Sequence, residues 1–220
     1  MKLGPLYIPK QILILLLLAV ILNLARVAIF DSLYFIYLLW NIFLAILPFI
    51  ASSLLLNYFN NKRLTKITFT IGFVAWLLLL PNAPYIVTDM IHLGRGRSAI
   101  LLYDTFLLFS SAWAGLLLGI YSISHIEKII KSKYSSKVTS ILVGFIILLT
   151  SFGVYLGRFL RFNSWDVISD TSFLFKNLWS VVSNPNEYID AYLFTGLTFL
   201  FIFVSYRAWK YTQIEPKSNI

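Results

Sequence analysis

The segment from Leu80 to His92, Leu-Pro-Asn-Ala-Pro-Tyr-Ile-Val-Thr-Asp-Met-Ile-His, holds the side chains best suited to acid–base chemistry. Asp89 and His92 are the catalytic candidates, because a carboxylate and an imidazole close together can exchange protons with a bound group. On an α-helix both would share a face with Tyr85. Two ligands do not define a metal site, so no metal site is predicted.

Two prolines in this segment, Pro81 and Pro84, are expected to break a helix inside the membrane. Each removes a backbone donor, and each disfavours helical geometry in the residue before it, here Leu80 and Ala83. Pro81 lies about 21 Å along the helix axis from Ile67, within a hydrocarbon layer about 30 Å thick. Irregular backbone at that depth must be covered by protein or line a water-filled cavity. We therefore expect either a broken helix that opens a polar pocket or a proline kink followed by an interfacial turn.

The segment from Gly157 to Asp166 holds a second group of candidates. Arg158 and Arg161, at i and i+3, would share a helix face, and two guanidiniums suit a phosphate or carboxylate. Alternatively, the arginines extend to lipid head groups and Trp165 belongs to the interfacial aromatic belt. We expect the two segments to meet at the outer membrane surface. The candidate ligand-binding set is Asn82, Tyr85, Arg158, Arg161, Trp165 and Asp166.

A buried polar layer is predicted beneath this site. Arg26, Asn82 and Asp104 come from three helices, and residue counting places each about 8 Å below the outer boundary. An unpaired charge there would cost several kcal/mol, so an Arg26–Asp104 ion pair is expected, with a hydrogen bond from Asn82. In the alternative, Arg26 extends upward to head groups or to Asp31.

The elements that position these residues are membrane helices. The 220-residue chain is 59% hydrophobic and 12% charged, against about 25% charged residues in a soluble domain. We predict an all-α integral membrane protein, with residues 1–220 forming a single transmembrane domain. The third helix is broken, and a short amphipathic helix at Thr171–Val182 lies in the last outer loop. Six apolar runs are long enough, or nearly so, to cross the bilayer: Gln11–Phe30, Leu33–Tyr58, Ile67–Leu80 with a continuation, Ala99–Ser124, Val138–Leu156 and Tyr188–Tyr206.

The net charge of +9 fits the excess of basic residues on the cytoplasmic side of membrane proteins, so no nucleic-acid partner is predicted. His125 is interpreted as a solvated residue of an inner loop. With no cysteine in the chain, disulfides and thiolate chemistry are excluded, and no cofactor is predicted. Twelve of the 18 basic residues lie on one side, which places both termini in the cytoplasm: Lys2, Lys10, Lys62, Arg63, Lys66, Lys128, Lys131, Lys133, Lys137, Arg207, Lys210 and Lys217.

The Pro-Asn-Ala-Pro-Tyr-Ile-Val-Thr-Asp run at 81–89 and the Gly-Arg-Phe-Leu-Arg-Phe-Asn-Ser-Trp-Asp run at 157–166 together resemble an uncharacterised membrane-protein family, domain of unknown function 1361. The resemblance covers most of the chain. It implies a multi-pass protein of the bacterial inner membrane and implies no activity.

Three classes of function remain. The first, which we favour, is a binding protein or enzyme whose outer-face site takes an anionic group, such as that of an anionic lipid or a polyprenyl phosphate. The second is a small-solute transporter; the predicted helix centres carry no ionisable residue, which favours an uncoupled one. The third is a non-catalytic assembly or accessory subunit, for which Gly115 and Gly119 offer a small-residue helix face. Whether chemistry occurs, and the oligomeric state, stay open.

Overall fold

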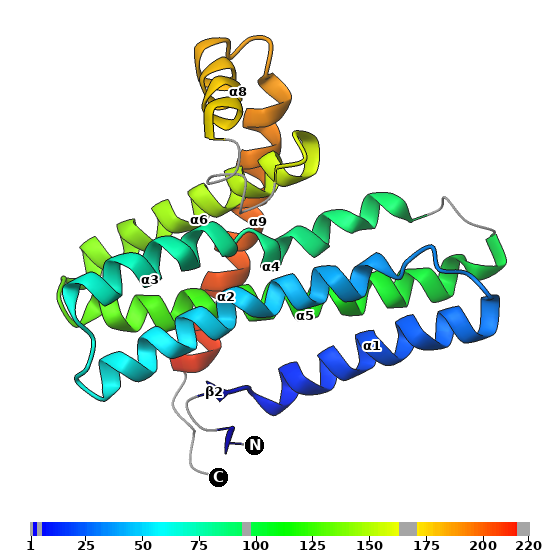
Figure 1. Cartoon of the computed structure of the whole chain (residues 1–220), viewed down its shortest axis with the longest axis horizontal. Coiled ribbons are helices and arrows are strands. Elements are labelled where there is room, and N and C mark those ends of the chain that lie inside the picture. The colour runs from blue at the N-terminus through cyan, green and yellow to red at the C-terminus, as the bar shows by residue number, and fades with distance from the viewer. Residues whose placement is uncertain (1, 4–5, 94–97, 163–170, 215–220) are drawn as a thin grey trace. The chain divides into compact units, whose positions relative to one another are not determined.

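The computed structural model describes residues 2–3, 6–93, 98–162 and 171–214 (Figure 1). The chain divides into two compact units, Met1–Thr139 and Ser140–Ile220. The expectation of one transmembrane domain stays a prediction. The elements are β1 (Lys2–Leu3), β2 (Leu6–Tyr7), α1 (Lys10–Phe30), α2 (Tyr37–Asn60), α3 (Lys66–Leu79), α4 (Asn82–Tyr85), the 3₁₀ helix η1 (Ile86–His92), α5 (Ser98–Lys131), α6 (Ser136–Phe159), α8 (Thr171–Ser183) and α9 (Ile189–Ile214).

The predicted fold class is confirmed. Within the described residues, six helical segments are long and apolar enough to cross a membrane, and the third of them, Lys66–His92, contains the break. The short helix expected before the last span is α8, and the protein is a multi-pass membrane protein. The strands β1 and β2 form only a two-residue antiparallel pair near the N-terminus.

The first unit is built around α5, which packs against α1, α2, α4 and η1. Figure 1 shows α1, α2 and α5 running side by side. With 34 residues, α5 is about 50 Å long, well beyond the hydrocarbon thickness. The helix therefore continues past Ser124, where the apolar run ends, to Lys131. Charged residues such as Lys128 do not stop a helix, because lysine has a high helix propensity.

The proline break is a change of helical pitch rather than an unwound segment. Leu80 keeps helical dihedrals (φ −57°, ψ −37°), and its N–H still bonds to the carbonyl of Trp76 at 2.9 Å. The expectation that the prolines push Leu80 out of helical geometry was wrong, and Ala83 also lies inside α4. The side chains of Leu80 and Ala83 are fully buried, and this packing outweighs the local proline preference. Beyond α4 the chain continues as the 3₁₀ helix η1.

Protein covers the break through a close helix contact. A Cβ on Gly115 of α5 would lie 2.6 Å from the carbonyl oxygen of Ala83, and a Cβ on Gly119 would lie 3.3 Å from the Cβ of Ala83. The Gly-x-x-x-Gly pair is thus used within the first unit, where α4 approaches α5. It is not the exposed helix face that a docking accessory subunit would offer.

In the second unit, the end of α6, α8 and the start of α9 share an apolar cluster. Tyr155, Val181 and Ala191 are buried together. The hydroxyl of Tyr192 donates to the carbonyl of Val181 at 3.0 Å, which ties the last turn of α8 to the first turn of α9.

Replacing Gly115 by Ala tests the close contact at the break. The added methyl group meets a backbone carbonyl that cannot rotate away, so we expect a loss of about 1–3 kcal/mol. The midpoint of thermal unfolding in detergent, followed by tryptophan fluorescence, should fall clearly. Gly119→Ala should cost less, because its neighbour is a methyl group at 3.3 Å. Gly144→Ala is the control, since nothing lies within 4 Å of its Cβ position. Equal midpoints for all three variants would contradict the close packing.

Candidate functional site

The pitch of η1 decides which side chains share a face. A 3₁₀ helix has three residues per turn, so residues three apart lie in line. Ile86, Asp89 and His92 therefore form one edge, of which Ile86 is 0% and Asp89 1% exposed. The face expected from α-helical spacing, with Tyr85 beside Asp89, does not apply here. Tyr85 instead ends α4, where its carbonyl accepts a hydrogen bond from the hydroxyl of Thr88 at 2.6 Å.

Helix α2 supplies partners for both acid–base candidates. The side-chain amide of Asn41 donates to Oδ2 of Asp89 at 2.8 Å. The ring of Tyr37 meets the ring of His92 edge to face, with centroids 6.0 Å apart. Tyr37 and Asn41 are four residues apart, so they share one face of α2. Residue spacing did not predict that Asn41 contacts Asp89 or that Tyr37 contacts His92. The one signal in the sequence was the polar residue Asn41 within an apolar run.

This arrangement can support proton exchange at one place. The Asn41 amide neither takes nor gives a proton under ordinary conditions, so exchange falls to Asp89 and His92. The hydrogen bond from Asn41 fixes one oxygen of the carboxylate. Among the described residues, no group of three or more His, Asp or Glu side chains could hold a metal.

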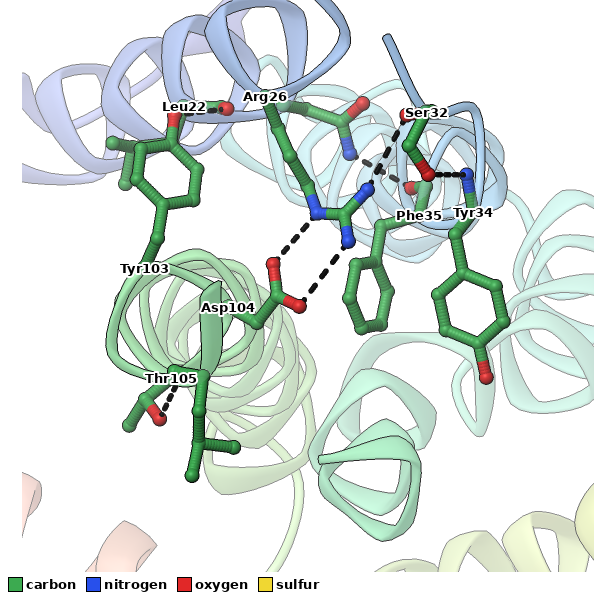
Figure 2. A network of polar contacts seen from close by, with 10 residues as sticks. Leu22, Arg26, Ser32, Tyr34, Phe35, Tyr103, Asp104 and Thr105 are labelled. Atoms are coloured by element: carbon green, nitrogen blue, oxygen red, sulfur yellow. Dashed lines mark hydrogen bonds and ion pairs between the residues drawn. The ribbon is translucent and has the colours of Figure 1, made fainter. Parts of the chain in front are cut away.

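The predicted Arg26–Asp104 ion pair is present and links α1 to α5 (Figure 2). Nε of Arg26 lies 2.6 Å from Oδ1 of Asp104, and Nη2 lies 3.2 Å from Oδ2, which makes the pair bidentate. Nη1 donates to the carbonyl of Ser32 at 3.3 Å, and the guanidinium carbon lies 4.7 Å from the centroid of the Phe35 ring. Arg26 is 4% and Asp104 5% exposed, so the guanidinium is buried and bound to Asp104.

Neighbouring groups extend this buried network. The amide of Asn23 donates to the carbonyl of Phe35 at 2.8 Å, and the hydroxyl of Tyr103 donates to the carbonyl of Leu22 at 2.6 Å. Asn82 donates to the carbonyl of Leu79 at 2.9 Å, and its place in the buried layer stays a prediction.

An aromatic contact connects the two polar groups of the first unit. The centroids of Phe35 and Tyr37 lie 6.1 Å apart. Phe35 carries the Arg26 guanidinium over its ring, and Tyr37 meets His92. The ion pair and the Asp89–His92 edge therefore belong to one packed region around the start of α2.

The arginine candidates lie at the end of α6, in the second unit. Arg158 is half-buried in the last turn of the helix, which ends at Phe159. Arg161 lies beyond this end, exposed and with a left-handed backbone (φ 57°), so the shared helix face predicted for the two arginines does not extend to it. Trp165 and Asp166 lie outside the described residues. The predicted meeting of Asp89 with the arginines stays a prediction.

The interpretation of His125 as a solvated loop residue was wrong. His125 lies inside α5, and its Nδ1 is 3.1 Å from the hydroxyl of Ser52 and 3.4 Å from that of Ser53, both on α2. Its ring also packs against Phe49, with centroids 5.4 Å apart. The error arose from ending the helix where the apolar run ends.

A double-mutant cycle tests the ion pair. Removing one partner leaves a buried charge, so Arg26→Ala and Asp104→Ala should each destabilise the protein by about 3–5 kcal/mol. The double variant should lose less than the sum, because the second change removes the stranded charge. The midpoint of thermal unfolding in detergent, compared with that of the wild type, gives the loss of stability in each of the three variants. Strictly additive losses would mean that the two side chains do not interact in the folded protein.

Comparison with known proteins gives one family. The family described as "Protein of unknown function (DUF1361)" matches residues 40–205, from α2 into α9. No curated protein and no solved structure matches the chain. The match covers Asn41, the α3–η1 break, Asp104 and the end of α6, so most of the residues that build the candidate site lie inside it. The chain belongs to the DUF1361 family of proteins of unknown function.

Proposed function

We propose that this protein of the bacterial inner membrane binds an anionic head group at its outer face, through Arg158 and Arg161. The observation that carries the proposal is the left-handed backbone of Arg161, at φ 57° just past the end of α6. This conformation costs a non-glycine residue roughly 1–2 kcal/mol. It is the left-handed position of the turn that ends α6, in which the N–H of Phe162 bonds to the carbonyl of Leu156 at 3.2 Å. It places a second guanidinium in the turn that follows the helix of Arg158.

The ligand class follows from the donors and from depth. Guanidinium groups pair with phosphate or carboxylate through two parallel hydrogen bonds. Arg158 lies about 30 Å along α6 from Val138, at the level of lipid head groups. An anionic phospholipid or a polyprenyl phosphate presents its phosphate at this level, because its hydrocarbon chains anchor it in the bilayer. A soluble anion has no such anchor. The lipid bilayer is therefore both the solvent of the protein and the source of the ligand.

Asp89 and His92 are the proposed acid–base pair if the bound group reacts. Both lie on the same edge of η1, which faces α2, and Asn41 holds the carboxylate by its hydrogen bond. The proposal assigns charge recognition to the arginines and proton transfer to η1. Trp165 and Asp166 remain part of the proposed ligand-binding set, with Asn82 and Tyr85.

Orientation can be tested by labelling, because the chain contains no cysteine. We propose that both termini and the turns after α2 and α5 are cytoplasmic, as the distribution of basic residues indicates. Single cysteines at Ser135 and Ser172, both exposed, then report the two sides. An impermeant thiol reagent on whole cells should label Ser172→Cys and spare Ser135→Cys until the cells are lysed. The reverse pattern would invert the topology.

Native mass spectrometry of protein purified in mild detergent tests the anion site. Wild-type protein should retain an anionic lipid or polyprenyl phosphate, and Arg158→Gln/Arg161→Gln should reduce the retained fraction at least tenfold. Arg158→Lys/Arg161→Lys should fall between, because lysine keeps the charge and loses the paired donors. Lys176→Gln, an exposed cation on α8, is the control and should retain as much as wild type. Retention that is equal in all variants would exclude the arginines as the site.

A further inference from the structure

The inner ends of α2 and α5 lie at one level. Ser122 donates to the carbonyl of Pro48 at 2.9 Å, and His125 contacts Ser52, so residues of α2 pair with residues about 74 positions later in α5. The same register places Asn60, the last residue of α2, beside the turn that follows α5. Nζ of Lys133 lies 5.6 Å from the ring centroid of Phe69 in α3, so the turn after α5 also lies against the start of α3.

The two turns at this end therefore form a single basic surface, which we call the inner basic patch. Its seven lysine and arginine side chains are all exposed, whereas Glu127, the acid nearest to them in the sequence, is 8% exposed and buried. Each turn joins the C-terminus of one helix to the N-terminus of the next, so the helix dipoles oppose each other and side-chain charge sets the sign. The patch consists of Lys62, Arg63, Lys66, Lys128, Lys131, Lys133 and Lys137.

Exposed apolar side chains lie among these cations. Ile67 is 73% and Tyr134 54% exposed, the first beside Lys66 and the second beside Lys133. Neither a nucleic-acid backbone nor a soluble phosphate would cover an exposed isoleucine, because both are polar. A phospholipid has both parts, since its phosphate pairs with cations and its acyl chains cover apolar side chains. Tyrosine also favours the boundary between head groups and hydrocarbon.

We infer that the inner basic patch binds an anionic phospholipid, and that a lipid with two phosphates engages both turns at once. The Lys133–Phe69 contact holds the α5–α6 turn over the start of α3, so cations from both turns face one head group. This site is separate from the proposed outer anion site and uses none of its residues. Only its assignment to the cytoplasmic leaflet rests on the proposed orientation.

Thermal shifts of delipidated protein in detergent test the inference. A ligand that binds only the folded state raises the unfolding midpoint in proportion to its occupancy. Cardiolipin should raise the midpoint more than phosphatidylglycerol at equal phosphate concentration, and phosphatidylcholine should have little effect. The pair Arg63→Gln/Lys131→Gln removes one cation from each turn and should lower the apparent cardiolipin affinity at least fivefold. Phe69→Leu should reduce the preference for cardiolipin over phosphatidylglycerol.

The controls separate a site from general charge attraction. Lys10→Gln/Arg207→Gln removes two exposed cations outside the patch and should keep the cardiolipin shift. An equal loss in that pair would overturn the inference, as would an equal or larger shift with inorganic pyrophosphate or a DNA oligonucleotide. Should Arg63→Gln/Lys131→Gln fail to fold, Lys62→Gln/Lys128→Gln makes the same test. Lipid retention by the Arg158 and Arg161 variants is measured in protein that also carries Arg63→Gln/Lys131→Gln. These changes remove lipid held at the inner basic patch, so either proposal can fail alone.

Discussion

The close approach of the Ala83 carbonyl to Gly115 is the constraint on which the α4–η1 region of the first unit depends. Two prolines remove two backbone donors inside hydrocarbon, where exposed carbonyls cannot find water. A glycine on α5 lets the backbone of α4 approach closely enough for protein to cover the break. Because α4 is held there, the 3₁₀ pitch that follows turns Asp89 toward Asn41 and His92 toward Tyr37.

Polar contacts set the register of the helices along α5. Lipid is as apolar as leucine, so apolar packing alone does not choose one alignment of two membrane helices over another. Arg26–Asp104 fixes α1 against α5 near the N-terminal end of α5. Further along α5, the hydroxyl of Ser122 accepts from the indole of Trp76 at 2.6 Å and donates to the carbonyl of Pro48. A buried ion pair contributes little net stability, but a mismatch would strand a charge, so its main effect is to exclude other alignments.

Depth counting from the sequence predicted the Arg26–Asp104 pair, because the rise of an α-helix is constant at about 1.5 Å per residue. Two expectations that rested on other reasoning failed: the α-helical spacing that put Tyr85 beside Asp89, and the end of the apolar run that put His125 in a loop. The 3₁₀ pitch of η1 depends on packing against α2 and α5. The sequence of the η1 segment alone carries no information about those contacts. The length of α5 depends on helix propensity beyond the membrane, and hydropathy does not measure it. In the sequence Asn41 is a neutral polar residue within an apolar run, and only the fold places it against Asp89, 48 positions away.

Charged residues occupy the left-handed position after three of the helices. Among the described residues, the non-glycine residues with positive φ are Asp31, Lys62 and Arg161, and each follows a helix. After α2, the N–H of Lys62 bonds to Phe59 and that of Arg63 to Tyr58, the pattern in which glycine usually takes the left-handed position. A lysine there costs about 1 kcal/mol relative to glycine. The N–H groups of Lys62 and Arg63 bond to two of the last carbonyls of α2 within a short turn. Lysine also leaves an exposed cation at the end of the helix, where glycine would leave none.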